Sequence, residues 1–216
     1  VSIWNDDDCI AVKDNSSNML FERINASGLG LVIGSIGNNQ IVKNITFRDS
    51  YMYKTVKGIY LKTRWNDNPP PGINIASITD ITYQNITMIE PTQFAIWLGP
   101  AQQSESGATC SLLWPHFNAK CSITGYHVWK NLLFKDIFIY KPKQSPGVIM
   151  GNSTYPMENI VFDNVQVIYD DDDNDKKKKN FKLLKPRPFG EDYYCNDGVH
   201  GKSIGNSFPV PHCLAN

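Results

Sequence analysis

The feature that most constrains the fold is a short segment that recurs along the chain. Each copy begins with Asn or Asp, continues with two or three apolar or Thr residues, and often ends in an aromatic residue. The copies lie at residues 18–21, 44–47, 80–83, 131–134 and 159–162. In four of them, Asn or Asp returns five residues after the first position. The basic unit is about 25 residues long, with insertions, and repeats of this period indicate a solenoid.

The residue types within the repeats favour β-structure over helices. The runs are short and rich in Ile, Val, Thr, Tyr and Phe, and Gly, Asn, Asp or Pro separates them. They lack the 3.6-residue periodicity of a helical repeat. We therefore predict an all-β fold, a right-handed parallel β-helix whose coils of about 25 residues point Ile and Val inward and stack Asn at one corner. An ordinary β-sandwich with recurrent turns is the alternative.

Composition narrows the class of protein. The 216 residues are 41% hydrophobic, which is enough for one sizeable core. Lys plus Arg number 21 and Asp plus Glu number 21, so a nucleic-acid partner bound through net charge is not expected. No apolar run is long enough to cross a bilayer, so we expect no membrane partner either. We expect a monomer.

The repeats suggest one domain in three parts. Residues 1–168 should form the coils, and residues 169–180 a flexible loop, because 170–179 read DDDDNDKKKK. Residues 181–216 have lost the repeat and should form a C-terminal cap of the same domain. Residues 66–72 and 99–126 read as loops inserted between coils. Because the sequence opens in the middle of a patterned segment, we expect it to be the C-terminal part of a longer protein.

Four of the five cysteines form two close pairs, each flanking a loop-like stretch. They are Cys110 with Cys121 and Cys195 with Cys213, and local disulfides would suit them, although the sequence does not fix their connectivity. Cys9 lies in an apolar run, so we expect it to be buried and unreactive.

Sequons for N-glycosylation, like the paired cysteines, favour a secreted, extracellular protein. The candidate glycosylation sites are Asn15, Asn25, Asn44, Asn85 and Asn152. Some of these asparagines belong to the recurring segment, where stacking at a corner of the coil also explains them.

The strongest chemical signal is the string Asn5-Asp6-Asp7-Asp8-Cys9. Adjacent carboxylates repel one another, and a protonated carboxyl beside an ionised one is what acid–base hydrolysis of a glycosidic bond requires. Taken alone, such a triplet is more often a solvated turn or a calcium ligand. Strand alternation would put Asp6 and Asp8 on one face. We expect no metal and no cofactor.

Two further strings follow at intervals that place them on successive coils. Residues 28–37 read Gly-Leu-Gly-Leu-Val-Ile-Gly-Ser-Ile-Gly, and residues 58–63 read Gly-Ile-Tyr-Leu-Lys-Thr. In order and spacing, the three strings resemble those of glycoside hydrolase family 28, the polygalacturonases and their relatives. That family has an Asp-Asp-Cys string, a Gly-His-Gly string leading into Gly-Ser-(Val/Leu/Ile)-Gly, and an Arg-Ile-Lys-Thr string.

The resemblance implies an inverting hydrolase of α-glycosidic bonds in a pectin-like polyuronate. Asp7 would match the general acid, Asp8 a carboxylate that activates water, and Lys62 the lysine that binds the substrate's carboxylate. Lys54, Lys57, Lys62 and Arg64 lie close together in the sequence, and we expect them to form a cationic strip beside the acidic cluster. The expected substrate-binding residues are Lys62, Tyr60, Asp6, Trp65 and Trp4.

The chain departs from the family at two matched positions. Leu29 stands where the family has His, and Tyr60 stands where it has a substrate-binding Arg, although a tyrosine ring can stack on a sugar. The family's upstream Asn-Thr-Asp string would precede Val1. Three alternatives stay open: the same fold acting on rhamnogalacturonan or another polysaccharide, a non-catalytic carbohydrate-binding β-helix, and, less favoured, a calcium-dependent lyase.

Overall fold

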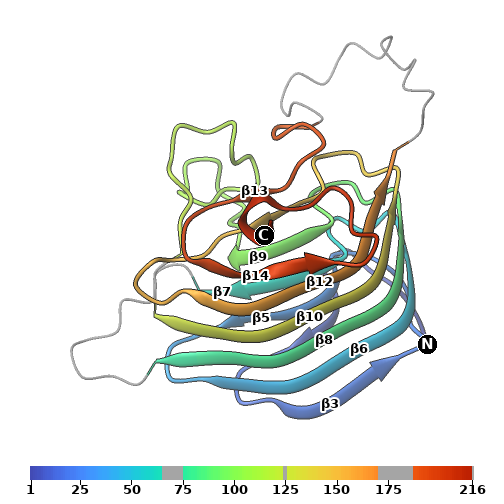
Figure 1. Ribbon diagram of the computed structural model, residues 1–216, viewed down its shortest axis with the longest axis horizontal. Coiled ribbons are helices and arrows are strands. Elements are labelled where there is room, and N and C mark those ends of the chain that lie inside the picture. Colours follow the sequence, from blue (N-terminus) through green and yellow to red (C-terminus); the bar gives the residue numbers. More distant parts are fainter. Residues whose placement is uncertain (65–74, 124–125, 170–186, 216) are drawn as a thin grey trace.

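The computed structural model describes residues 1–64, 75–123, 126–169 and 187–215, which wind into one stack of coils (Figure 1). The larger sheet contains β1 (Ser2–Trp4), β3 (Ser17–Glu22), β4 (Asn25–Ser27), β6 (Ile41–Tyr53), β8 (Ala76–Ile89), β10 (His127–Tyr140), β12 (Met157–Ile168) and β14 (Val199–Ile204). The smaller sheet contains β2 (Asp8–Val12), β5 (Gly30–Ile36), β7 (Ile59–Thr63), β9 (Ile96–Pro100), β11 (Gly147–Ile149) and β13 (Tyr194–Cys195).

Each strand of the stack pairs in parallel with the strand one coil away. Thus β6 pairs with β8, β8 with β10 and β10 with β12, while β5 pairs with β7 and β7 with β9. From β4 to β14, strands that are neighbours in the chain alternate between the two sheets, which a hairpin sandwich does not allow. The predicted parallel β-helix is confirmed, and the sandwich alternative is wrong.

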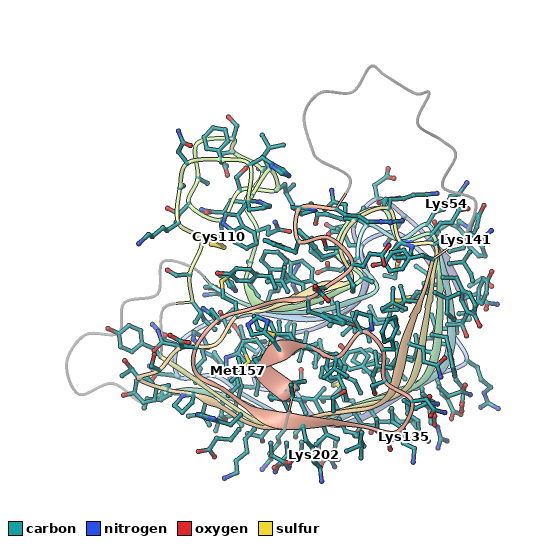
Figure 2. The ribbon with its side chains drawn as sticks, turned by 45° about the horizontal axis from the view of Figure 1, so that its top comes forward. Lys54, Cys110, Lys135, Lys141, Met157 and Lys202 are labelled. Atoms are coloured by element: carbon teal, nitrogen blue, oxygen red, sulfur yellow. A yellow bond between two sulfur atoms is a disulfide. The ribbon has the colours of Figure 1, made fainter. Side chains whose placement is uncertain are left out.

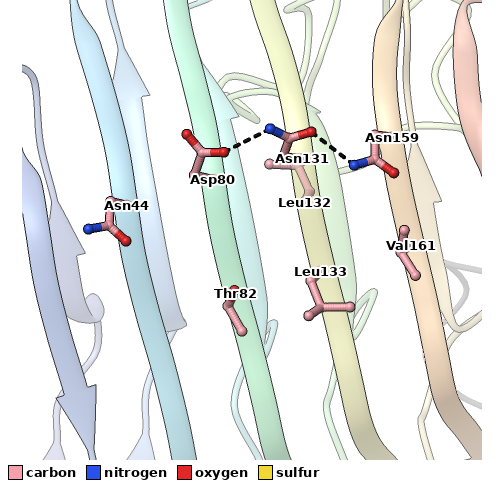
Figure 3. A pocket seen from close by; sticks show the side chains of 8 residues that line it. All are labelled: Asn44, Asp80, Thr82, Asn131, Leu132, Leu133, Asn159 and Val161. Carbon is pink, nitrogen blue, oxygen red and sulfur yellow. Dashed lines mark hydrogen bonds between the residues drawn. The ribbon is translucent and has the colours of Figure 1, made fainter.

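The Asn or Asp that opens each repeat lies at a corner of the coil. Asn44, Asp80, Asn131 and Asn159 have φ angles of 54–57°, a left-handed conformation that Asn and Asp tolerate better than other side chains. The Asn131 amide donates to Asp80 at 2.8 Å and accepts from Asn159 at 2.9 Å. Figure 3 shows these rungs along a pocket on the outer face of the larger sheet. The predicted stacking at one corner is confirmed.

The aromatic residue that ends each repeat fills the interior of the helix. Phe21, Phe47, Tyr83, Phe134 and Phe162 are aligned by the strand register and form one ladder, in which the first four rings are stacked and Phe162 meets Phe134 edge-on. Neighbouring ring centroids along it are 4.7–5.7 Å apart. The Tyr83 hydroxyl donates to the Leu31 carbonyl at 3.2 Å, which satisfies its polar atom inside the core. This ladder joins the coils along the axis of the solenoid.

From β5 to β11, the smaller sheet is largely buried on both faces. Its inner face belongs to the main core, while its outer face forms a second apolar cluster under residues 101–123 and 187–194. Trp97 on β9 contacts Trp114 of the covering loop, with ring centroids 6.0 Å apart. The Cys110–Cys121 disulfide predicted from the sequence closes this loop. Burial on two faces explains why β5, β7 and β9 are almost continuously apolar.

The C-terminal segment continues the solenoid. β14 pairs with β12 and β13 pairs with β11, so these strands extend both sheets although the sequence repeat is absent after residue 180. The signal was weak because β14 reads VHGKSI and is mostly exposed. A short 3₁₀ helix, η1 (His212–Leu214), buries Leu214, and the Cys195–Cys213 disulfide joins it to β13, as predicted. Residues 170–179, expected to be a flexible charged loop, lie outside the described residues.

Within the part of the chain that the structure describes, no helix has the length and apolarity to span a membrane. The same residues contain no cluster of three or more His, Cys, Asp or Glu side chains arranged to hold a metal ion.

Candidate active site

The acidic cluster lies where the chain turns into β2. Asp6 and Asp7 are exposed in a bend, and Asp8 is the first residue of the strand. The backbone N–H of Leu29, one coil away, donates to the Asp7 carbonyl at 2.8 Å, and the Asp7 carboxylate accepts the Asp8 N–H at 2.7 Å. The pairing of β2 with β5 shifts between Asp8 and Ile10. Bulges re-aim side chains, so strict alternation does not hold in this segment.

Asp8 is the carboxylate that the fold holds most firmly. Its two oxygens accept hydrogen bonds from Lys62 Nζ at 3.2 and 3.1 Å. The side chains of Asp8 and Lys62 are only 9% and 12% exposed, respectively. Lys62 lies on β7, two strands away from Asp8, and its Nζ is 4.5 Å from the centre of the Tyr60 ring. The three strings singled out in the sequence therefore meet on one face of the smaller sheet.

Tyr60 is not available as a sugar platform. It is 4% exposed and belongs to the apolar cluster beneath residues 101–123. Its hydroxyl accepts the Gln102 N–H at 2.8 Å, and burial raises the pKa of that hydroxyl well above its usual value. The prediction that Tyr60 stacks on substrate is therefore wrong, because the side chain is buried and the ammonium groups of Lys57 and Lys62 lie over its ring.

Lys57 is a second cation in this region, and it is fully buried. Its ammonium donates to Gln93 Oε1 and lies 4.6 Å from the Tyr60 ring centre and 5.5 Å from that of Trp97. Burial, helped by the nearby charge of Lys62, lowers the pKa of Lys57 to about 7. Sequence alone placed Lys57 on a surface strip and gave no sign of this burial.

The predicted cationic strip is not formed, because its four members go to different places. Lys54 lies at another corner of the coil, 3.9 Å from Glu90, and Figure 2 shows it at the same edge as Lys141. Lys57 is buried, Lys62 is bound to Asp8, and Arg64 lies 3.3 Å from Asp14. The reason is that only Lys62 belongs to β7, whereas Lys54 and Lys57 precede the strand and Arg64 follows it.

Leu29 lies in the short connection between β4 and β5. Its backbone bonds to both neighbouring coils. The Leu29 N–H donates to the Asp7 carbonyl, and the Leu29 carbonyl accepts from the backbone N–H of Lys57 at 3.2 Å. Gly28 beside it has no room for a side chain, because a Cβ would lie 2.1 Å from Asn5 Oδ1 and 2.8 Å from the Asp7 carbonyl. These residues fix the backbone of the acidic bend. Leucine brings no imidazole to the site.

Trp4 and Trp65 were predicted as substrate contacts, and the described residues include Trp4 alone of the two. Trp4 is 69% exposed at the end of β1, directly before the acidic bend. Trp65 lies outside the described residues. The role of Trp4 in binding stays a prediction.

Cys9 is buried, as predicted, and its thiol lies 3.5 Å from Asn5 Oδ1. Burial raises the pKa of this thiol, which disfavours the reactive thiolate.

The five candidate glycosylation sites have different surroundings. Asn44 and Asn85 are corner rungs whose amides donate to Asn18 and Asp49 at 2.8 and 2.7 Å. Asn15 donates to Gln40 at 2.7 Å, and Asn152 donates to the Ile123 carbonyl at 3.3 Å. Asn25 is exposed on β4. Modification at these positions stays a prediction.

Lys13 lies beside the acidic cluster and was not among the residues predicted for the site. Lys13 follows β2 directly, and its Nζ donates to the Gly34 carbonyl at 2.6 Å and lies 3.9 Å from Asp8 Oδ2. Its side chain is 60% exposed. Lys13 comes five residues after Asp8 and directly after the apolar run, and this position was the sign in the sequence that it could lie near the acidic cluster.

Comparison with known families agrees with this arrangement. Residues 1–185 match the model of Glycosyl hydrolases family 28. The chain belongs to this family. The match covers the acidic bend, the glycine-rich string and the Lys62 string.

Family 28 relatives are similar to part of this chain. A probable endopolygalacturonase E from Aspergillus niger is 32% identical over 97 residues, which is 44% of this chain and 24% of the relative. A probable endopolygalacturonase I from Aspergillus clavatus is 35% identical over 109 residues, 49% of this chain and 27% of the relative. An exopolygalacturonase from Arabidopsis thaliana is 34% identical over 86 residues, 38% of this chain and 19% of the relative. The alignments thus cover about a quarter or less of these relatives.

Proposed function

We propose that this chain carries catalytic carboxylates of a polygalacturonase-type hydrolase that cleaves α-glycosidic bonds in a pectin-like polyuronate. The observation that carries the proposal is the pairing of an exposed carboxylate, Asp7, with a neighbouring carboxylate, Asp8, that is held by Lys62. Glycoside hydrolysis needs two carboxyl groups in different protonation states, and different surroundings are what separates their roles. The relatives named endo- and exopolygalacturonases support the same substrate class.

The proposed reaction assigns one role to each group. Asp7 donates a proton to the oxygen of the leaving sugar as the glycosidic bond breaks. Asp8 removes a proton from water while the water oxygen bonds to the anomeric carbon from the opposite side, which inverts that carbon. Lys62 stabilises the negative charge of Asp8 and contacts the carboxylate of the bound uronate. The reaction proposed here uses no cofactor, and we propose that the protein acts as a secreted monomer.

A second substrate class follows from two residues of the site. Leu29 cannot hydrogen-bond to a substrate through its side chain, and Tyr60 is buried, so neither offers a polar group to a uronate carboxylate. A backbone with fewer carboxylates, such as rhamnogalacturonan, needs fewer such contacts. We keep hydrolysis of that backbone as the alternative.

The deciding experiment follows new reducing ends. The protein, expressed with any residues its gene encodes ahead of Val1, is incubated separately with polygalacturonate and with rhamnogalacturonan. The Asp7→Asn and Asp6→Asn variants are run alongside, because both remove an exposed carboxylate from the same bend. Glu158→Gln on β12 is the remote control.

We expect release from polygalacturonate by the parent protein and by Glu158→Gln. Asp7→Asn should lose turnover by at least about a hundredfold, the usual contribution of a general acid, while Asp6→Asn should lose much less. Full activity of a folded Asp7→Asn variant would sink the assignment. Release from rhamnogalacturonan alone would favour the alternative, and binding without release would mark a carbohydrate-binding protein.

A further inference from the structure

Two lysines flank the carboxylate of Asp8, and they differ in what else they contact. Lys62 Nζ reaches both oxygens of Asp8 and lies over the Tyr60 ring. Lys13 Nζ is 3.9 Å from the nearer Asp8 oxygen and donates to the Gly34 carbonyl. The side chain of Lys62 is 12% exposed, whereas that of Lys13 is 60% exposed. Of these two lysines, Lys13 is therefore the one that presents most of its side chain to solvent.

The two ammonium groups also differ in how many hydrogen-bond donors they have left for a ligand. A lysine ammonium has three donors. Lys62 uses two of its donors on Asp8 and turns its ammonium toward an aromatic ring. Lys13 uses one donor on Gly34 and is too far from Asp8 for a hydrogen bond. Lys13 thus keeps donors for an anion that arrives from solvent.

The backbone fixes where the Lys13 ammonium lies. Gly34 has a φ angle of 116° and lies where the pairing of β5 with β7 shifts, between Ile33 and Ile36. A Cβ at Gly34 would lie 2.0 Å from the Lys62 carbonyl, so only glycine lets the two strands approach here. Lys13 donates to the Gly34 carbonyl, and Gly34 lies against the backbone of Lys62. The Lys13 ammonium is therefore held next to the point where β5 and β7 come close together.

We infer that Lys13 determines specificity for acidic sugars at this site, by binding the carboxylate of a uronate unit beside Asp7 and Asp8. The inference rests on the proposed function and deepens it, since it assigns a substrate contact outside the three matched strings. Lys62, in contrast, is held mainly as the partner of Asp8. A neutral sugar offers Lys13 no charge to pair with, so this residue should favour charged over esterified substrate.

The test compares an oligomer of galacturonate with its methyl ester, which has the same sugar backbone and no charge on its carboxyl groups. Binding of each is measured by calorimetry on the Asp7→Asn variant, so that turnover does not remove the ligand. Lys13→Met is added to that background, with Lys13→Arg as the conservative variant. Lys43→Met, which removes another exposed lysine on the larger sheet, is the matched control.

We expect Lys13→Met to weaken binding of the charged oligomer about tenfold or more, as loss of a charge-assisted hydrogen bond does. Binding of the methyl ester should change less than about twofold, because its carbonyl group carries no charge to pair with an ammonium. Lys13→Arg should restore most of the affinity, and Lys43→Met should have no effect. In the Asp7 protein, Lys13→Met should raise KM for polygalacturonate and leave kcat nearly unchanged.

Two results would overturn the inference while leaving the proposed function intact. One is unchanged binding of the charged oligomer in Lys13→Met, and the other is an equal loss for both ligands, which would mean a structural role. If the Asp7→Asn protein with Lys13 present binds neither ligand, the proposed function fails and the inference fails with it.

Discussion

Lys62 and Asp8 form an ion pair between residues 54 positions apart in the chain, with Nζ 3.1 Å from Oδ2. The two residues come from β7 and β2, and β5 lies between these strands. Both side chains are largely buried, and in such surroundings a charge pair is stronger than on the surface. This pair links the acidic bend to the third coil of the stack.

Removing Lys62 should destabilise the protein. In Lys62→Met, the Asp8 carboxylate loses a buried cationic partner, and we expect the free energy of unfolding to fall by about 1–3 kcal/mol. Urea denaturation measures the change. Lys130→Met breaks the exposed pair with Glu158 and should cost under about 1 kcal/mol. The double variant Asp8→Asn/Lys62→Met should lose less than the sum of the two single variants, and additive losses would mean that the pair is not coupled.

Lys57 should make stability rise between pH 7 and pH 9. Its pKa is lowered from 10.5 to about 7, chiefly by burial and secondarily by Lys62, so in this range the unfolded chain binds a proton that the folded chain does not. Stability increases with pH wherever the unfolded state holds more protons. Relative to Lys57→Met, the free energy of unfolding should gain ~2 kcal/mol from pH 7 to pH 9. Urea denaturation at both pH values tests this, and parallel behaviour of the two proteins would contradict it.

The corner rungs should depend on backbone conformation as well as on hydrogen bonds. Asn131 has a φ angle of 57° and makes two side-chain bonds within the ladder. Asn131→Ala loses both bonds and places an unfavourable residue in the left-handed region, whereas Asn131→Gly loses only the bonds. We expect the alanine variant to be less stable than the glycine variant by about 1 kcal/mol, as measured by urea denaturation. The opposite order would show that the backbone conformation is not limiting.

The Cys110–Cys121 disulfide should hold the cover over the outer face of the smaller sheet. Replacing both cysteines by serine should lower the free energy of unfolding by ~2–3 kcal/mol, because the unfolded chain is no longer constrained. Opening the cover would also expose Trp97 and Trp114, which are buried against each other. A red shift of tryptophan fluorescence in the folded variant reports that opening. An unshifted spectrum with normal stability would mean that packing alone secures the loop.

Local chemistry explains why so much of the fold could be predicted. The recurring Asn or Asp is favoured where the repeat turns into the left-handed region, and the aromatic that follows it packs on its counterpart in the next coil. The corner residue and the aromatic residue lie within one repeat, so each residue type recurs at the period of the coil and can be recognised in the sequence. The two disulfides join the cysteines that lie closest in the chain, as expected, although the sequence left their connectivity open.

The tertiary structure alone decided which charged and aromatic side chains reach solvent. Strand alternation tells which side of a sheet a residue faces, but not whether a distant segment covers that side. Residues 101–123 cover Tyr60 and Trp97, and so a residue predicted to face substrate lies in a second core. The sequence by itself thus determined the coil and the acidic string, while long-range packing selected Lys62 as the partner of Asp8 and left Lys13 exposed beside it.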